Sequence, residues 1–155
     1  MDDIGKKATR ALWSLYFSER GSAADKQGVD GWMKGSTFQL KTDVEIARTG
    51  NLYYEVQEKD KGRPEQPWRR SPGAAMLYIF ISRSLALLVP KTMLLAGAKG
   101  VPFEPNPTSR GYLIPIRTLQ EGPGEVTGYY GNQLPRRTKE ALEKYGFILN
   151  FGTDP

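Results

Sequence analysis

The sequence contains no cysteine and no histidine among its 155 residues. Without cysteine, the chain has neither a disulfide framework nor a thiolate zinc site. Without histidine, it excludes Ser-His-Asp and Cys-His catalysis, and also the nucleases that bind metal through histidine. Any hydrolytic site in this chain therefore depends on carboxylates, lysine, tyrosine or a hard metal ion.

Long hydrophobic runs are also missing. No apolar stretch approaches the roughly 20 residues that cross a bilayer as a helix. No charged segment followed by an apolar one and a small-residue cleavage site precedes the rest of the chain. We therefore expect a soluble, intracellular protein without membrane contact, located in the cytoplasm, or in the host cytoplasm if a phage encodes it.

The composition is that of an ordinary globular protein, with 39% hydrophobic and 25% charged residues. A chain of this length suits one domain over residues 1–155 with one modest core. The formal net charge of +5 fits a polyanionic partner such as DNA, because contacts to phosphates release counterions. Many basic proteins of this size bind no nucleic acid, so charge alone does not decide the partner.

Residues 29–42 predict a β-hairpin with its turn at residues 34–36. Side chains of a strand point alternately to its two faces. One face of the hairpin then carries the apolar residues Val29, Met33, Phe38 and Leu40. The other face carries Asp30, Gln39 and Lys41.

The register of this hairpin decides which side chains meet. A two-residue loop places Asp30 opposite Gln39 or Lys41, whereas a slip of one residue would place it opposite Leu40. Two interpretations of the polar face remain open. It is either the solvated side of a half-buried hairpin, or a phosphodiesterase site with oxygen ligands for Mg²⁺ or Mn²⁺ beside a lysine that positions water.

The spacing of Asp30, Gln39 and Lys41 resembles the D…(D/E/Q)xK signature of the PD-(D/E)xK nuclease superfamily. The surrounding sequence, over residues 25–43 and 49–55, is similar to small phage and bacterial nuclease-like proteins. The resemblance extends over residues 5–120. It implies an α/β (α+β), restriction-endonuclease-like fold with a mixed central sheet flanked by helices. It also implies a DNA endonuclease that depends on Mg²⁺ or Mn²⁺.

The same resemblance implies roles for individual residues. Asp30 and Gln39 would bind the metal, with the Leu40 carbonyl, and Lys41 would orient the attacking water. Glu19, near the end of the predicted first helix, would add a catalytic carboxylate. The alternative interpretation of Glu19 is a solvated glutamate at a helix end without a catalytic role.

A further carboxylate could come from Glu55. It would join the polar face of the hairpin as a metal ligand if its strand and the hairpin are sheet neighbours, and otherwise it is an exposed strand glutamate.

Two departures from the family pattern bear on activity. Gln39 is neutral where an acid is commoner, and Ala75 stands where the resembling proteins carry an acid.

The rest of the chain predicts alternating elements. Periodicity and turn signals indicate a helix at 7–20, strands at 52–59, 75–82, 85–89 and 112–116, helices at 91–98 and 135–145, and a short strand at 147–151. Pro115 places the strand at 112–116 at an edge or a bulge. Residues 100–111 are expected to be a proline-broken loop.

Residues 60–73 form a basic segment with prolines and one tryptophan. Cationic side chains interleaved with an aromatic one suit the capture of a nucleic-acid strand by charge and stacking. The candidate nucleic-acid-binding residues are Lys61, Arg63, Trp68, Arg69 and Arg70. The alternative interpretation of this segment is a solvated surface loop.

Three functions from different classes follow. The first is the metal-dependent DNA endonuclease. The second is a nucleic-acid-binding or junction-binding protein of the same fold whose catalytic site has decayed. The third is a phage accessory protein that binds a protein partner. A homodimer stays open, because superfamily members that cut both strands are often dimers.

Overall fold

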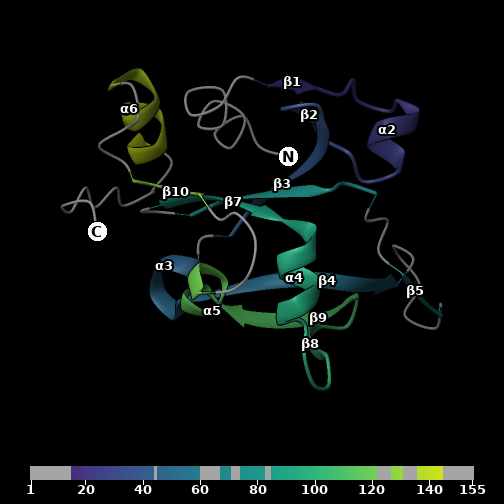
Figure 1. Ribbon diagram of the computed structural model, residues 1–155. Helices are drawn as coiled ribbons and strands as arrows, with labels where there is room; N and C mark the ends of the chain where they lie inside the picture. The colour runs from purple at the N-terminus through teal and green to yellow at the C-terminus, as the bar shows by residue number, and fades with distance from the viewer. Residues whose placement is uncertain are drawn as a thin grey trace.

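The computed structural model describes residues 15–43, 45–59, 67–70, 74–82, 85–121, 127–130 and 136–144. These residues form two β-sheets and short helices, so the predicted α+β class is confirmed (Figure 1). The helices are α2 (Ala23–Lys26), α3 (Ile46–Thr49), α4 (Lys91–Gly97), α5 (Ile116–Glu121) and α6 (Arg136–Lys144). Within the described ranges, no helix is long and apolar enough to cross a membrane.

The first sheet has six strands. In spatial order they are β1 (Tyr16–Phe17), β2 (Gly31–Met33), β3 (Ser36–Thr42), β6 (Leu77–Ile81), β7 (Leu85–Pro90) and β10 (Thr127–Tyr130). β3 and β6 run parallel, whereas the other neighbours are antiparallel, so the sheet is mixed.

The predicted hairpin consists of β2 and β3. Gly31 pairs with Phe38 and Met33 with Ser36, which is the register of a two-residue turn. The turn residues Lys34 and Gly35 have φ angles of 48° and 73°. Two positive φ angles define the type I′ turn, whose twist matches that of the strands it joins. The predicted register is therefore confirmed from Gly31 to Phe38, whereas Asp30 lies beyond the last paired residue and its N–H donates to the Phe38 carbonyl instead of pairing with Gln39.

β6 lies between β3 and β7 and is buried on both faces, as its continuous apolar sequence predicts. Ile79 and Ile81 pack with Phe38 and Leu40 on one face of the sheet. Tyr78 and Phe80 belong to a second cluster on the opposite face. The strand thus separates two apolar layers.

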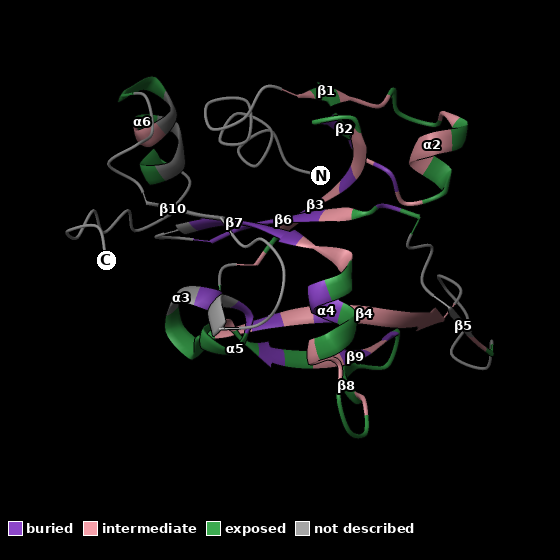
Figure 2. Ribbon diagram, viewed as in Figure 1, coloured by how far each residue is buried: buried purple, intermediate pink, exposed green. Residues whose placement is uncertain are grey.

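The second sheet covers the face that carries Tyr78 and Phe80. Its strands, in spatial order, are β5 (Trp68–Arg70), β4 (Asn51–Lys59), β9 (Ser109–Pro115) and β8 (Phe103–Asn106). Leu52 and Ile114, both fully buried, pack from this sheet against Val89 and Leu94. Figure 1 shows the two sheets as layers, and Figure 2 shows buried residues along both. A sheet, not only helices, therefore flanks the mixed sheet.

The prediction of a helix over residues 7–20 is wrong at its C-terminal end. Tyr16 and Phe17 form β1, which pairs with β2. The Phe17 ring meets the Phe38 ring edge-on at 5.7 Å between centroids, so a tertiary contact overrides the helical periodicity. Residues 7–14 lie outside the described part of the chain.

Two further predictions need correction. The expected loop at 100–111 contains β8, which pairs with β9 as a hairpin. The strand predicted at 112–116 ends one residue earlier, because Ile116 begins α5. Pro115 is the last residue of β9, at a strand end rather than on an edge strand, where its missing N–H is tolerated.

Other predicted elements are confirmed. β4, β6 and β7 fall where strands were expected, and α4 begins directly after Pro90. The C-terminal helix is α6, over residues 136–144. The short strand predicted at 147–151 lies outside the described residues.

Candidate functional site

Asp30 lies at the point where the pairing of β2 with β3 stops. Its backbone N–H donates to the Phe38 carbonyl at 2.8 Å, and its carbonyl accepts the Ser18 N–H at 2.7 Å. Its side-chain Oδ2 accepts the Leu40 N–H at 2.7 Å. The carboxylate of Asp30 therefore takes the place that a backbone carbonyl would have in the next ladder hydrogen bond of β3.

Because the Asp30 carboxylate takes this place, the surroundings of the Leu40 carbonyl also change. Continuation of the ladder would place Val29 opposite Leu40, with both hydrogen bonds exchanged between them. The Val29 N–H donates instead to the Ala24 carbonyl at 2.9 Å. The N–H and C=O of one strand residue point to the same side, so the Leu40 carbonyl faces the Asp30 side without its ladder donor.

The charge of Asp30 is costly in this position. Burial raises the pKa of its carboxyl, and the Leu40 N–H and the Lys41 ammonium group oppose this shift only in part. A half-buried carboxylate with raised pKa gains from a cation placed beside it. Oδ1 of Asp30 has no hydrogen-bond partner within the described ranges, so it is available to such a cation.

Gln39 and Lys41 extend from β3 toward the second sheet, because their neighbours Phe38 and Leu40 occupy the opposite face. Both residues line a pocket of about 220 Å³, a volume that includes space open to solvent. The described residues that line it are Gln39, Lys41, Tyr53, Tyr54, Glu55, Tyr78 and Phe80. Asp30 is not among them and lies at the adjoining edge of β3.

Glu55 borders the pocket, but its carboxylate is held elsewhere. Oε2 accepts the Ser109 hydroxyl at 2.6 Å, and the Tyr53 hydroxyl lies 2.5 Å from the Ser109 Oγ. Ser109 has one hydroxyl proton, so Tyr53 donates to Ser109 and Ser109 to Glu55. Ser109 shares its strand face with the exposed Leu113, away from the first sheet. β4 and β3 belong to different sheets.

Glu19 does not lie on a helix. It is exposed in the segment between β1 and α2, and its carbonyl accepts the Ser22 N–H. The expectation of a helix-borne Glu19 is therefore wrong, because β1 replaces that end of the helix. Catalytic roles for Glu19, and metal binding by Glu55, stay predictions; Glu55 would first have to leave Ser109.

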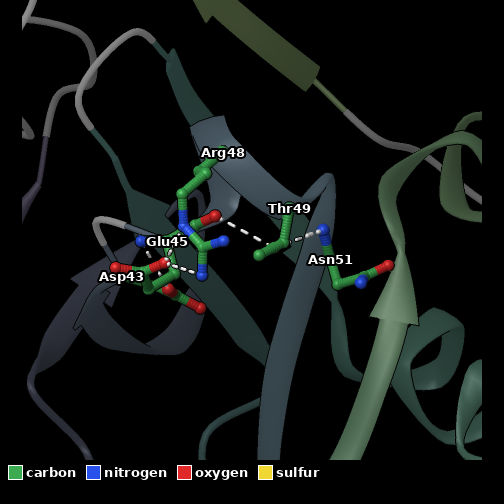
Figure 3. A network of polar contacts seen from close by, with 5 residues as sticks. All are labelled: Asp43, Glu45, Arg48, Thr49 and Asn51. Atoms are coloured by element: carbon green, nitrogen blue, oxygen red, sulfur yellow. Dashed lines mark hydrogen bonds and ion pairs between the residues drawn. The ribbon is translucent and has the colours of Figure 1, made fainter.

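Asp43 connects the two sheets close to the pocket. Oδ1 accepts the Glu45 N–H at 3.2 Å and Oδ2 accepts the Tyr53 N–H at 3.3 Å. Burial raises the pKa of Asp43, partly offset by these hydrogen bonds. Figure 3 shows Asp43 beside the Glu45–Arg48 pair at α3. Asp43 thereby links the end of β3 to the start of β4.

Of the five candidate nucleic-acid-binding residues, Trp68 is the one whose side chain the structure describes. The Lys59 Nζ lies 5.0 Å and the Arg110 Cζ 4.5 Å from its ring centroid, so two cations already contact the indole. Arg110 was not among the candidates predicted from the sequence, because β9 brings it in from a distant segment. Lys61 and Arg63 lie outside the described residues. Arg69 and Arg70 belong to β5, but their side chains are not described.

The Asp30 carboxylate and the Leu40 carbonyl lie on the same edge of β3 and are oxygen ligands of the kind that Mg²⁺ prefers. The Gln39 amide lines the adjoining pocket, which Asp30 does not. No group of three or more acidic, histidine or cysteine residues occurs in the part of the chain that the structure describes. Mg²⁺ nevertheless often binds proteins through one or two carboxylates, several waters and substrate phosphates. The donor set therefore suits a metal shared with a phosphate substrate.

Comparisons of this chain with protein-family models, with curated proteins and with solved structures found no significant match.

Proposed function

We propose that this protein is a divalent-metal-dependent DNA endonuclease with a restriction-endonuclease-like fold. One observation carries the proposal. The carboxylate of Asp30 replaces a backbone carbonyl in the β3 ladder and lies on the same strand edge as the freed Leu40 carbonyl. Lys41 follows Leu40 directly and lines the adjoining pocket with Gln39. Support for the fold comes from a hairpin whose second strand has a parallel neighbour, β6.

Each of these residues has a separate role in phosphodiester hydrolysis. Asp30, the Leu40 carbonyl and Gln39 would hold Mg²⁺ or Mn²⁺, which supplies charge neutralisation at the phosphate and acidifies water when bound. Lys41 donates hydrogen bonds to the attacking water and to the negative charge that develops on the phosphate. Tyr54, Tyr78 and Phe80 form an aromatic wall of the pocket.

The proposal predicts metal-dependent cutting that requires Lys41. Supercoiled, branched and single-stranded DNA are each incubated with the purified protein and Mg²⁺ or Mn²⁺, or with EDTA. Cutting is expected only with metal, and Lys41→Ala should lower its rate by about 100-fold or more. The loss follows from removing the group that stabilises transition-state charge.

Lys99→Ala is the matched control, because Lys99 is an exposed lysine just after α4. It removes the same charge far from β3 along the chain and should cut DNA as the wild type does. Cutting that persists in EDTA, or that survives Lys41→Ala, contradicts the proposal.

A second candidate is a nucleic-acid-binding or junction-binding protein with a decayed site. Two observations favour it: Gln39 brings no negative charge to a metal, and the buried Ala75 brings none either. This candidate predicts DNA binding that weakens steeply with salt and no metal-stimulated cutting of any substrate in the same assay. Either candidate is compatible with a homodimer.

A further inference from the structure

Two exposed aromatic side chains lie side by side on the first sheet. Tyr16 on β1 and Trp32 on β2 are Cα partners in the antiparallel register, with 78% and 43% of their surfaces exposed. Cross-strand partners point to the same face of a sheet. Their chain neighbours Phe17 and Met33 pack into the apolar cluster on the other face. We call this pair the Tyr16–Trp32 surface.

This surface extends across the hairpin. Trp32 pairs with Thr37 on β3. The Thr37 hydroxyl accepts the N–H of Met76, whose side chain is 52% exposed. Aromatic and apolar side chains from β1, β2 and the residue before β6 thus lie at the end of the sheet near the turn, where the exposed Lys34 adds a positive charge.

The Tyr16–Trp32 surface adjoins the candidate site. Gln39 follows Thr37 by two residues on β3 and faces the same way, so it is a diagonal neighbour of Trp32 at about 7–8 Å between Cα atoms. Asp30 directly precedes β2 and lies two residues before Trp32, so the carboxylate and the indole come from neighbouring positions of the hairpin.

We propose that the Tyr16–Trp32 surface stacks on unpaired bases of the DNA, close to the phosphate that the candidate site engages. The inference rests on the proposed function and gives it a substrate class: single-stranded DNA, or the unpaired arm of a flap or branch. Exposed aromatic faces bind successive unpaired bases irrespective of their sequence. In a continuous duplex those base faces are covered by neighbouring base pairs.

Trp68 does not offer the same surface, because Lys59 and Arg110 already contact its ring. A base would have to displace one of these cations. The Tyr16–Trp32 surface is more exposed and lies next to Gln39 and Asp30, so it is the better candidate for base stacking.

The test measures binding in EDTA, so that it depends on neither metal nor cutting. A short fluorescein-labelled single strand and the same sequence as a duplex are titrated with protein, and fluorescence anisotropy is recorded. Trp32→Ala should weaken single-strand binding by about tenfold, the loss of one stacked base, and change duplex binding by less than about twofold. Trp32→Phe should restore most of the affinity.

If circular dichroism shows that Trp32→Ala is unfolded, Tyr16→Ala is the second variant. It should also weaken single-strand binding. Leu113→Ala, which removes an exposed apolar side chain from the outer face of the second sheet, is the control and should bind as the wild type. Equal losses on single strand and duplex, or no loss, overturn the inference. A wild-type dimer that Trp32→Ala converts to a monomer also overturns it, because the aromatics then pack against a second copy.

Failure of this inference can be told apart from failure of the nuclease proposal. Loss of single-strand affinity in Trp32→Ala, in a protein that cuts no DNA, supports the surface and rejects the nuclease. Metal-dependent cutting by the wild type, with unchanged strand binding in Trp32→Ala, rejects the surface and supports the nuclease.

Discussion

At the residue scale, the candidate site depends on the unusual place of one carboxylate. Asp30 accepts a hydrogen bond from the backbone of the neighbouring strand, where a regular hairpin would have a carbonyl. A peptide carbonyl at that place is neutral, whereas an ionised carboxylate there is partly desolvated, which raises its pKa. Ionisation of Asp30 therefore lowers the stability of the folded protein, a cost that a bound cation would offset.

The raised pKa of Asp30 predicts a pH-dependent effect of Asp30→Asn. The folded protein binds the Asp30 proton more tightly than the unfolded chain does, so this carboxyl contributes stability below its unfolded pKa of about 3.9. That contribution is lost as pH rises through the folded pKa. In EDTA, Asp30→Asn should therefore have a higher melting temperature than the wild type at pH 7, and the difference should close near pH 4.

Melting curves by circular dichroism over this pH range check the prediction. Glu143→Gln, the same loss of charge at an exposed position of α6, serves as the control and should shift the melting temperature little at either pH. A variant Asp30→Asn that melts below the wild type at pH 7 without metal would show that the carboxylate stabilises the fold.

At the element scale, the β2–β3 hairpin sets the positions of Asp30, Gln39 and Lys41 through its turn. The type I′ turn requires positive φ at both turn residues, and Lys34 adopts φ 48°. A left-handed conformation strains a residue that carries a Cβ, and asparagine tolerates it better than lysine. The turn thus fixes the register at some cost in stability.

Lys34→Asn should relieve this strain. We expect the free energy of unfolding to rise by about 0.5–1 kcal/mol, because Asn-Gly is the favoured type I′ sequence. Urea denaturation measures the change. Lys34→Gln is the control, because it removes the same charge but glutamine does not favour positive φ. An equal gain in stability in both variants would mean that the loss of charge, not the relief of backbone strain, is responsible.

At the scale of the whole molecule, the apolar layer between the two sheets holds the pocket in shape. Ile114 from β9 is fully buried in this layer. Its Cγ2 lies so close to Gly97 of α4 that a Cβ at that glycine would be only 2.8 Å away. The layer connects the second sheet, the helix and the face that carries Gln39 and Lys41.

Ile114→Ala should lower the free energy of unfolding by about 2–5 kcal/mol, because it leaves a cavity in this layer. Leu113→Ala is the matched control one residue earlier in β9, on the exposed face. It should change stability by less than about 0.5 kcal/mol. Denaturant midpoints measure both, and similar values for the two variants would contradict the assigned burial.

Local elements could be predicted from the sequence where their signals come from nearby residues. Alternation and a Lys-Gly turn were enough for the hairpin and its register, and a continuous apolar run was enough for β6. Strand alternation also predicted that Gln39 and Lys41 share one face of β3, and both line the pocket, whereas Asp30 lies at the adjoining edge. Their function stays a prediction.

Features that depend on contacts between distant parts of the chain could not be predicted from the sequence. Packing on Phe38 made Tyr16–Phe17 a strand where periodicity indicated a helix. β4 pairs with β9 in the second sheet, and this pairing brings the Ser109 hydroxyl to the Glu55 carboxylate. Long-range pairing and burial have no signature in local periodicity, because their stability comes from partners far along the chain.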